Sequence, residues 1–209
     1  MTMDSGALVF VVDDDDSVRK AVERLLRSAD LEVETYGSAS DFLARPPHHG
    51  PSCLILDVRM PGLSGLDLQK HLAESGRRHG VIFMTGYGTI PMTVHAMRAG
   101  AVDFLEKPFE DRALIEAVHK ALREDRQAKQ KRDELEEIQE RIDLLTPRER
   151  EVFSLVVTGK LNKQIGWELG TSEKTIKAQR AQVMKKMRAD SLADLVRLAE
   201  KLAARHSED

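Results

Sequence analysis

The sequence is poor in the residues that crosslink a chain or anchor it in a membrane. Among 209 residues it has one cysteine, Cys53, and one tryptophan, and aromatic residues make up 4%. One cysteine cannot form an internal disulfide, which excludes a small disulfide-stapled fold. No apolar run approaches the roughly 20 residues of a membrane-spanning helix. The first residues, MTMDSGALVFVVD, lack the basic stretch and cleavage site of a signal peptide. We therefore expect a cytoplasmic chain with no membrane partner.

Charge, by contrast, is abundant and unevenly distributed. Hydrophobic residues make up 41% and charged residues 32% of the chain, as in soluble globular proteins. Residues 1–143 hold 19 Lys and Arg against 26 Asp and Glu, a net charge of −7. Residues 144–209 hold 13 against 9, a net charge of +4. An acidic first part and a basic second part predict two domains with different partners.

Short apolar runs alternate with amphipathic segments over residues 1–122. The runs are residues 8–13, 31–36, 53–57, 81–84 and 102–106, and helical spacing occurs at 17–29, 39–45, 65–75, 90–99 and from Asp111 onward. Strands that alternate with helices form βαβ crossovers and a parallel sheet with helices on both faces. We therefore predict an α/β domain at residues 1–122, with a five-stranded doubly wound parallel sheet.

A helical segment without proline or glycine follows, and we predict a helical linker at residues 123–143. Apolar side chains near its end have the spacing of a coiled-coil seam: Leu135, Ile138, Ile142 and Leu145. Residues 123–134, however, are almost wholly polar. The pattern leaves two interpretations open, a solvated linker helix and a helix that forms a dimer.

Residues 144–209 have the pattern of a small all-α domain with four helices. Thr146, Pro147 and Glu149 form a capping-box sequence at the start of the first helix. The next helices are predicted from Asn162 to Gly170, from Ser172 to about Met187, and over residues 191–204. A short helix, a turn and a longer helix form the helix-turn-helix pattern.

Charged and polar side chains stand at the ends of four predicted strands. Asp13 and Asp14 follow the first strand, Asp57 ends the third, Thr85 follows the fourth and Lys107 follows the fifth. Ligands of open parallel sheets bind beyond the carboxyl ends of the strands, so we expect these residues to meet. Neighbouring carboxylates repel one another unless a cation lies between them, and Mg²⁺ prefers oxygen ligands. The pattern predicts a magnesium site.

Helix capping is the alternative explanation for the run of four aspartates. Capping would account for one or two of them, and we expect Asp16 or Ser17 to be the N-cap of the following helix. It does not account for Asp57, Thr85 and Lys107 at the ends of other strands.

The helix-turn-helix segment is strongly basic. Residues 160–188 contain eight Lys and Arg against two Glu. Basic side chains neutralise DNA phosphates, and the second helix of such a motif enters the major groove. The alternative is a basic face that is merely solvated.

These motifs resemble those of a known family. The pieces VVDDD, CLILDVRMPGLSG, MTGYG and VDFLEKPF resemble the receiver domain of two-component response regulators. The segment LTPREREVFSLVVTGKLNKQIGWELGTSEKTIKAQRAQVMKKM resembles the DNA-binding domain of the LuxR class. Their order is that of the NarL/FixJ response regulators, especially the FixJ-like branch. The resemblance implies a flavodoxin-like or CheY-like receiver at residues 1–122 and a LuxR-type helix-turn-helix domain at residues 144–209.

The resemblance assigns roles at the sheet edge. Asp57 is implied as the phosphoryl acceptor. Asp14 is implied to bind Mg²⁺ directly, Asp13 to bind it largely through water, and the backbone carbonyl of Arg59 to be a further ligand. Lys107 is implied to pair with a phosphoryl oxygen and to precede a cis bond to Pro108.

The resemblance also implies a switch. The hydroxyl of Thr85 is implied to donate to the phosphoryl group in the active state, and Phe104 to be a rotating aromatic residue. An alternative for Phe104 is an ordinary core position in an apolar strand.

In the second domain, the resemblance implies two groups of DNA contacts. Residues implied to face the bases are Lys177, Ala178 and Ala181, and residues implied to lie near phosphates are Lys163, Ser172, Lys174 and Thr175. We expect packing between the helices from Ile165, Trp167, Leu169, Ile176 and Val183.

The implied protein is a transcription regulator activated when a sensor histidine kinase phosphorylates Asp57. Its implied partners are double-stranded promoter DNA, the kinase, RNA polymerase and, when phosphorylated, a second copy. Two surfaces compete for the dimer, residues 90–111 and the seam at Leu135, Ile138 and Ile142; we favour residues 90–111 because short isolated coiled coils are marginal.

Two other functions compete with this interpretation. A magnesium phosphohydrolase would use Asp57 as nucleophile, but such enzymes usually have a second acidic residue two positions later, where this chain has Arg59. A binding module that takes no phosphate would not need the complete acceptor set. We therefore expect no enzyme activity beyond Mg²⁺-dependent self-phosphorylation from a donor and slow autodephosphorylation.

Overall fold

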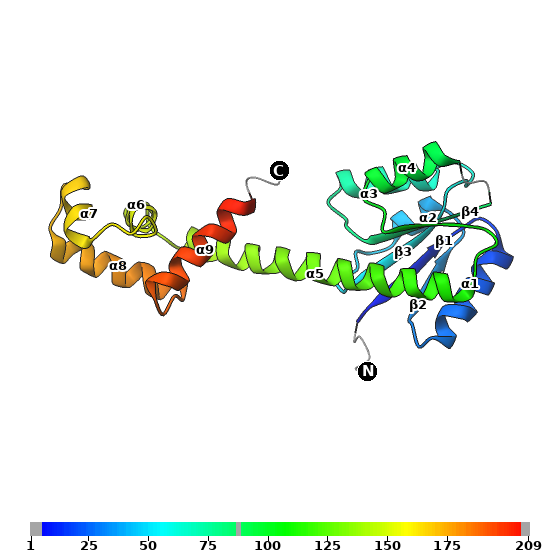
Figure 1. Cartoon of the computed structure of the whole chain (residues 1–209), viewed down its shortest axis with the longest axis horizontal. Coiled ribbons are helices and arrows are strands. Elements are labelled where there is room, and N and C mark those ends of the chain that lie inside the picture. The colour runs from blue at the N-terminus through cyan, green and yellow to red at the C-terminus, as the bar shows by residue number, and fades with distance from the viewer. Residues whose placement is uncertain (1–5, 87–88, 206–209) are drawn as a thin grey trace. The chain divides into compact units, whose positions relative to one another are not determined.

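The computed structural model describes residues 6–86 and 89–205, which divide into two compact units. Unit 1 spans Met1–Lys129 and unit 2 spans Gln130–Asp209 (Figure 1). Among the helices of the described ranges, none combines the length and the apolar character needed to cross a bilayer.

Unit 1 contains a five-stranded parallel sheet, as predicted. Its strands are β1 (Leu8–Val12), β2 (Val33–Tyr36), β3 (Ser52–Asp57), β4 (Gly80–Thr85) and β5 (Asp103–Glu106). They are ordered β2-β1-β3-β4-β5, and every neighbouring pair is parallel. The carboxyl ends of all five strands therefore lie at one edge of the sheet.

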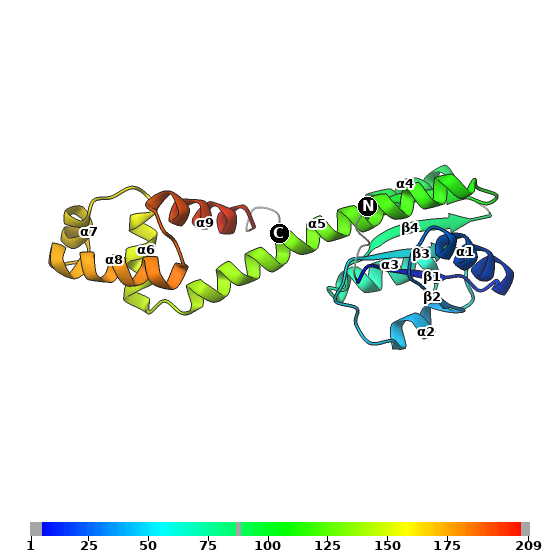
Figure 2. The same cartoon turned by 90° about the horizontal axis from the view of Figure 1, so that it is seen from below.

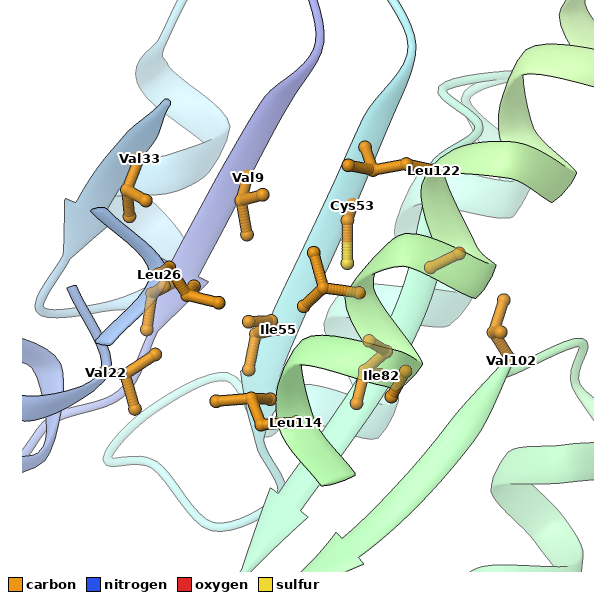
Figure 3. Close-up of a cluster of buried hydrophobic side chains, with 14 of the residues drawn as sticks. Val9, Val22, Leu26, Val33, Cys53, Ile55, Ile82, Val102, Leu114 and Leu122 are labelled. Carbon is orange, nitrogen blue, oxygen red and sulfur yellow. The ribbon is translucent and has the colours of Figure 1, made fainter. Parts of the chain in front are cut away.

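Helices cover both faces of this sheet. They are α1 (Asp16–Ser28), α2 (Ala39–Ala44), α3 (Gly65–Glu74), α4 (Ile90–Arg98) and the first half of α5 (Asp111–Asp143) (Figure 2). Side chains alternate along the strands, so Val9 and Ile55 face α1 and α5 (Figure 3), whereas Phe10 and Leu54 face α2 and α3. A sheet buried on both faces explains why the strands are continuously apolar.

The long helix α5 contributes to both hydrophobic cores. Leu114, Val118 and Leu122 are buried in unit 1, whereas Ile138 and Ile142 pack in the core of unit 2. The division between the units therefore falls inside the segment 123–143 that we predicted as a linker. Three of the four side chains of the predicted coiled-coil seam, Ile138, Ile142 and Leu145, are part of a domain core, which counts against the interpretation as a dimer-forming helix.

The described part of unit 2 consists of the end of α5 and four further helices, as predicted. These helices are α6 (Pro147–Val156), α7 (Asn162–Glu168), α8 (Glu173–Met187) and α9 (Leu192–Arg205). Thr146 forms the expected capping box with Glu149, and Ser172 caps α8 by accepting a hydrogen bond from the backbone N–H of Thr175. Helices α6 and α8 therefore each begin after a residue whose side chain satisfies a free backbone donor.

The core of unit 2 holds α7 and α8 together. Ile165, Ile176 and Val183 are fully buried and Leu169 is half-buried, as expected. The expectation for Trp167 was wrong, because this side chain is 88% exposed. Residues advance by about 100° along a helix, so Trp167 lies on the side of α7 away from the buried Ile165.

Candidate functional site

The predicted site residues stand at the carboxyl ends of adjacent strands. Asp13 follows β1, Asp57 is the last residue of β3, Thr85 is the last residue of β4 and Lys107 follows β5. Since β1 and β3 are neighbours with Val12 paired to Leu56, Asp13 and Asp57 come next to each other. The fold thus converts residues far apart in sequence into one cluster at the sheet edge.

Lys107 joins the two carboxylates. Its Nζ lies 2.6 Å from Oδ2 of Asp13 and 2.9 Å from Oδ1 of Asp57. Asp13 is 1% and Asp57 7% exposed, so both carboxylates are largely removed from water. The ammonium group is therefore the counter-charge for two buried carboxylates.

Backbone N–H groups bind the remaining carboxylate oxygens. The Arg59 N–H donates to Oδ2 of Asp57 at 2.8 Å, and the Asp15 N–H donates to Oδ1 of Asp13 at 2.9 Å. Arg19 also donates to the backbone carbonyl of Asp13 at 2.6 Å. These contacts fix the direction of both carboxylates before any ligand binds.

Burial and the ion pairs act on the protonation of this cluster. Burial raises the pKa of Asp57, while Lys107 and the Arg59 N–H oppose that rise. For Lys107, burial favours the neutral form, but the hydrogen bonds that the ammonium donates to Asp13 and Asp57 outweigh it and raise the pKa of Lys107. Lys107 therefore stays charged, and Asp57 is a carboxylate of raised basicity, which suits a nucleophile.

The donor set fits a magnesium ion that keeps part of its water. No three His, Cys, Asp or Glu side chains within residues 6–86 and 89–205 form a group able to hold a metal alone. Asp13 and Asp57, however, already converge on one cation, the Lys107 ammonium. Mg²⁺ is commonly bound through one or two carboxylates with several waters retained, and these two carboxylates meet that need.

The other residues of the acidic run have different positions. Asp14 is exposed, beside the buried Asp13. Asp15 caps α1, since its Oδ1 accepts from the backbone N–H groups of Ser17 and Val18 at 2.8 and 3.3 Å. The expectation of Asp16 or Ser17 as N-cap was wrong, because α1 already begins at Asp16 and the cap must precede the first helical residue.

Of the predicted switch residues, Thr85 ends β4 and Phe104 lies within β5. Thr85 is 1% exposed, and its backbone carbonyl accepts a hydrogen bond from the Lys107 N–H at 2.7 Å. Phe104 is half-buried, with its ring centroid 6.2 Å from that of Phe83. The bond between Lys107 and Pro108 is cis, as the resemblance implied. Thr85 is thus joined directly to the backbone of the residue that holds the two carboxylates.

In unit 2, α8 presents an exposed polar face. Ile176, Val183 and Met187 mark its buried side. The residues predicted to contact DNA are all exposed: Lys163, Ser172, Lys174, Thr175, Lys177, Ala178 and Ala181. Gln182 and Lys185 are exposed on the same helix. The sequence analysis did not select Gln182, because the resemblance gave this position no role.

Two basic residues of α8 have structural partners instead. Arg180 donates to Oδ1 of Asn162 at 3.2 Å, which links α8 to α7. Lys186 donates to Glu149 at 2.6 Å and to the backbone carbonyl of Leu144 at 3.1 Å. The basic character of the segment therefore divides between residues that hold the domain together and residues that face outward.

Comparisons with known proteins identify both domains. Residues 9–119 match the response regulator receiver domain, and residues 143–199 match the LuxR family of bacterial regulatory proteins. The chain is 50% identical over 204 residues to nodulation protein W of Bradyrhizobium diazoefficiens, covering 97% of this chain and 90% of that protein. It is 46% identical over 191 residues to the transcriptional regulatory protein FixJ of Azorhizobium caulinodans, covering 91% and 90%.

A solved structure is similar over nearly the whole length. The response regulator StyR superposes with a TM-score of 0.85 at 46% identity, covering 94% of this chain and 99% of StyR. Both domains, their order and their lengths are thus those of known regulators. The chain belongs to the family of response regulators that join a receiver domain to a LuxR-type DNA-binding domain.

Proposed function

We propose that phosphorylation of Asp57 switches this response regulator between two states and so controls its binding to promoter DNA. The observation that carries this proposal is the cluster at the sheet edge, where the buried carboxylates of Asp13 and Asp57 share the Nζ of Lys107. A buried, oriented carboxylate with raised pKa is suited to attack phosphorus. The phosphoryl donor is a sensor histidine kinase, as in two-component systems.

In the transfer step, an oxygen of Asp57 forms a bond to phosphorus, and the bond between phosphorus and the donor breaks. The transferred phosphoryl group is negatively charged, and the Nζ of Lys107 already lies 2.9 Å from Oδ1 of Asp57. Lys107 then pairs with a phosphoryl oxygen. When bound, Mg²⁺ neutralises charge on the transferring phosphoryl group. The residues that would hold it are Asp13, Asp14, Asp57 and Arg59, the last through its backbone carbonyl.

The signal leaves the site through the end of β4. The backbone carbonyl of Thr85 accepts a hydrogen bond from the Lys107 N–H, which holds the end of β4 beside the phosphorylation site. From this position, the Thr85 hydroxyl turns toward a phosphoryl oxygen. That movement frees space beside Phe104, which packs against Phe83 and is only half-buried. Thr85 and Phe104 thus have two arrangements, and the contacts that Thr85 makes with the phosphoryl group favour one of them.

The adjacent face of α4 supports dimerisation of the phosphorylated form. Ile90, Val94 and Met97 are 83%, 43% and 43% exposed, and their spacing places them on one side of the helix. The competing seam is weakened because Ile138 and Ile142 already pack in unit 2. We infer that residues 90–111 form the interface and that phosphorylation favours it.

In this function, a dimer binds promoter DNA through two copies of α8 and recruits RNA polymerase. The regulator works in the cytoplasm, and its only chemistry is self-phosphorylation and slow autodephosphorylation. A two-fold dimer places its recognition helices about one DNA turn apart.

The test is the mass of the intact chain after incubation with acetyl phosphate and Mg²⁺. The wild type gains the mass of one phosphoryl group, whereas Asp57→Asn and a sample with a metal chelator gain none. Asp41→Asn, at an exposed aspartate of α2, is the matched control and is labelled like the wild type. Equal labelling of wild type and Asp57→Asn would rule out Asp57 as the acceptor.

A further inference from the structure

The exposed face of α8 has an uneven chemical composition. Successive residues turn by about 100°, so the side opposite the buried Ile176 and Val183 can be assigned. Its central row contains Lys174, Ala178, Ala181 and Lys185, and all are exposed. Lys177 and Gln182 flank this row on its two sides and are also exposed.

Two alanines at the centre of this face restrict what the helix can read there. An alanine methyl group offers only an apolar contact, for instance with the methyl group of thymine. Short side chains at Ala178 and Ala181 also allow the helix backbone to approach the floor of a groove. Longer side chains on the flanks can then reach base edges on either side.

Gln182 is the flanking residue with the chemistry to distinguish bases. Its amide carries both a donor and an acceptor, whereas the lysines of this face only donate. A glutamine amide pairs with N6 and N7 of adenine through two hydrogen bonds. Within the described residues, the side chain of Gln182 makes no hydrogen bond or ion pair.

We propose that Gln182 is a specificity-determining residue that reads an adenine in the major groove of each half-site. This inference rests on the proposed binding of promoter DNA by α8. The neighbouring Gln179 offers a contrast, because its side-chain oxygen is buried and it is only half-exposed as a residue. One glutamine of the helix therefore faces outward and the other inward.

The test is selection from randomised double-stranded DNA with the full-length chain treated with acetyl phosphate and Mg²⁺. The wild type enriches a half-site with adenine at one position. Gln182→Ala loses the preference at that position alone, and discrimination there falls by about 5- to 150-fold. Gln182→Glu shifts the preference to cytosine, because a carboxylate accepts from N4 of cytosine. Gln179→Ala is the matched control and keeps the wild-type base pattern.

Two results would overturn the proposal, and they can be told apart. If the wild type enriches a half-site and Gln182→Ala enriches the same one, Gln182 reads no base, while the proposed DNA binding stands. If the wild type enriches no sequence, DNA recognition itself fails, and the assignment of Gln182 fails with it. Circular dichroism of each variant shows that a changed base pattern does not come from an unfolded domain.

Discussion

Replacement of Lys107 by methionine tests the electrostatics of the phosphorylation site. Methionine keeps an unbranched apolar side chain but removes the ammonium group that lies 2.6 Å from Asp13 and 2.9 Å from Asp57. Two neighbouring carboxylates then lose their shared counter-charge. We expect Lys107→Met to lower the free energy of unfolding of unit 1 in the absence of Mg²⁺.

The size of the effect follows from burial. Removing one partner of a buried ion pair costs about 3–5 kcal/mol. The side chains of Lys107 and Asp57 are 22% and 10% exposed, so water relieves part of the repulsion. We therefore expect a loss of about 2–3 kcal/mol, which is a large fraction of the roughly 5–15 kcal/mol that stabilises a typical domain.

The loss should depend on pH and on magnesium. Without Lys107 the carboxylate pair takes up a proton more readily when folded than when unfolded, so its pKa in the folded variant is raised. A folded state that binds more protons becomes less stable as the pH rises. The deficit is therefore greatest near pH 8 and smaller at pH 5. Bound Mg²⁺ replaces the missing charge and reduces the deficit as its concentration increases.

Urea unfolding followed by circular dichroism measures this prediction, at both pH values and with and without MgCl₂. The matched control is Lys70→Met in α3, because the Lys70 side chain is 78% exposed and its ion pair with Glu74 is long, at 3.9 Å. Such an exposed pair contributes little to stability. Identical midpoints for Lys107→Met and Lys70→Met at pH 8 would refute the electrostatic account of the site.

Three further predictions concern other parts of the chain. Burial, with the nearby Arg45, lowers the pKa of His79 from 6.5 to about 4, so the unfolded chain binds more protons than the folded one between these values. The contribution of neutral His79 to the free energy of unfolding is therefore fully present above pH 6.5, and up to about 3 kcal/mol of it is lost as the pH drops to 4. In His79→Gln, urea midpoints measured across this range should lose most of that dependence on pH. A fragment of residues 130–209 should have a higher thermal midpoint than one of residues 144–209, because the shorter fragment lacks Ile138, which is 2% exposed. Loss of a buried side chain of this size costs about 2–5 kcal/mol. Equal midpoints would contradict the placement of Ile138 in the core of unit 2. Lys177→Ala should weaken binding to a selected site more than binding to random DNA, and an equal loss in anisotropy titrations would make Lys177 a phosphate contact.

The sheet edge was the part of the molecule most open to prediction. Apolar runs located the strands, and parallel strands share one edge, so Asp13, Asp57 and Lys107 were expected to meet before any distance was known. Their ion pairs were not predictable, because the pattern shows which residues converge but not which atom faces which. The sequence suggested a cation between the carboxylates, and in the structure the ammonium of Lys107 takes that position.

The helical parts were harder to predict because one spacing serves several purposes. Ile138 and Ile142 have the same spacing in a coiled-coil seam and in a domain core, and only the packing of α5 on unit 2 distinguishes them. Trp167 was expected to pack between the helices, yet the turn of α7 places its side chain outside. Asp15 was missed as the N-cap because four consecutive aspartates offer several equivalent capping residues.

The most direct test of the central claim is the affinity of the full-length chain for a selected promoter site, measured by fluorescence anisotropy with and without acetyl phosphate. Wild type and Asp57→Asn are compared in the same Mg²⁺ buffer. The account predicts that the donor tightens binding by the wild type and leaves binding by Asp57→Asn unchanged. An equal gain for Asp57→Asn, or no gain for a wild type shown by its mass to be phosphorylated, would contradict control of DNA binding through Asp57.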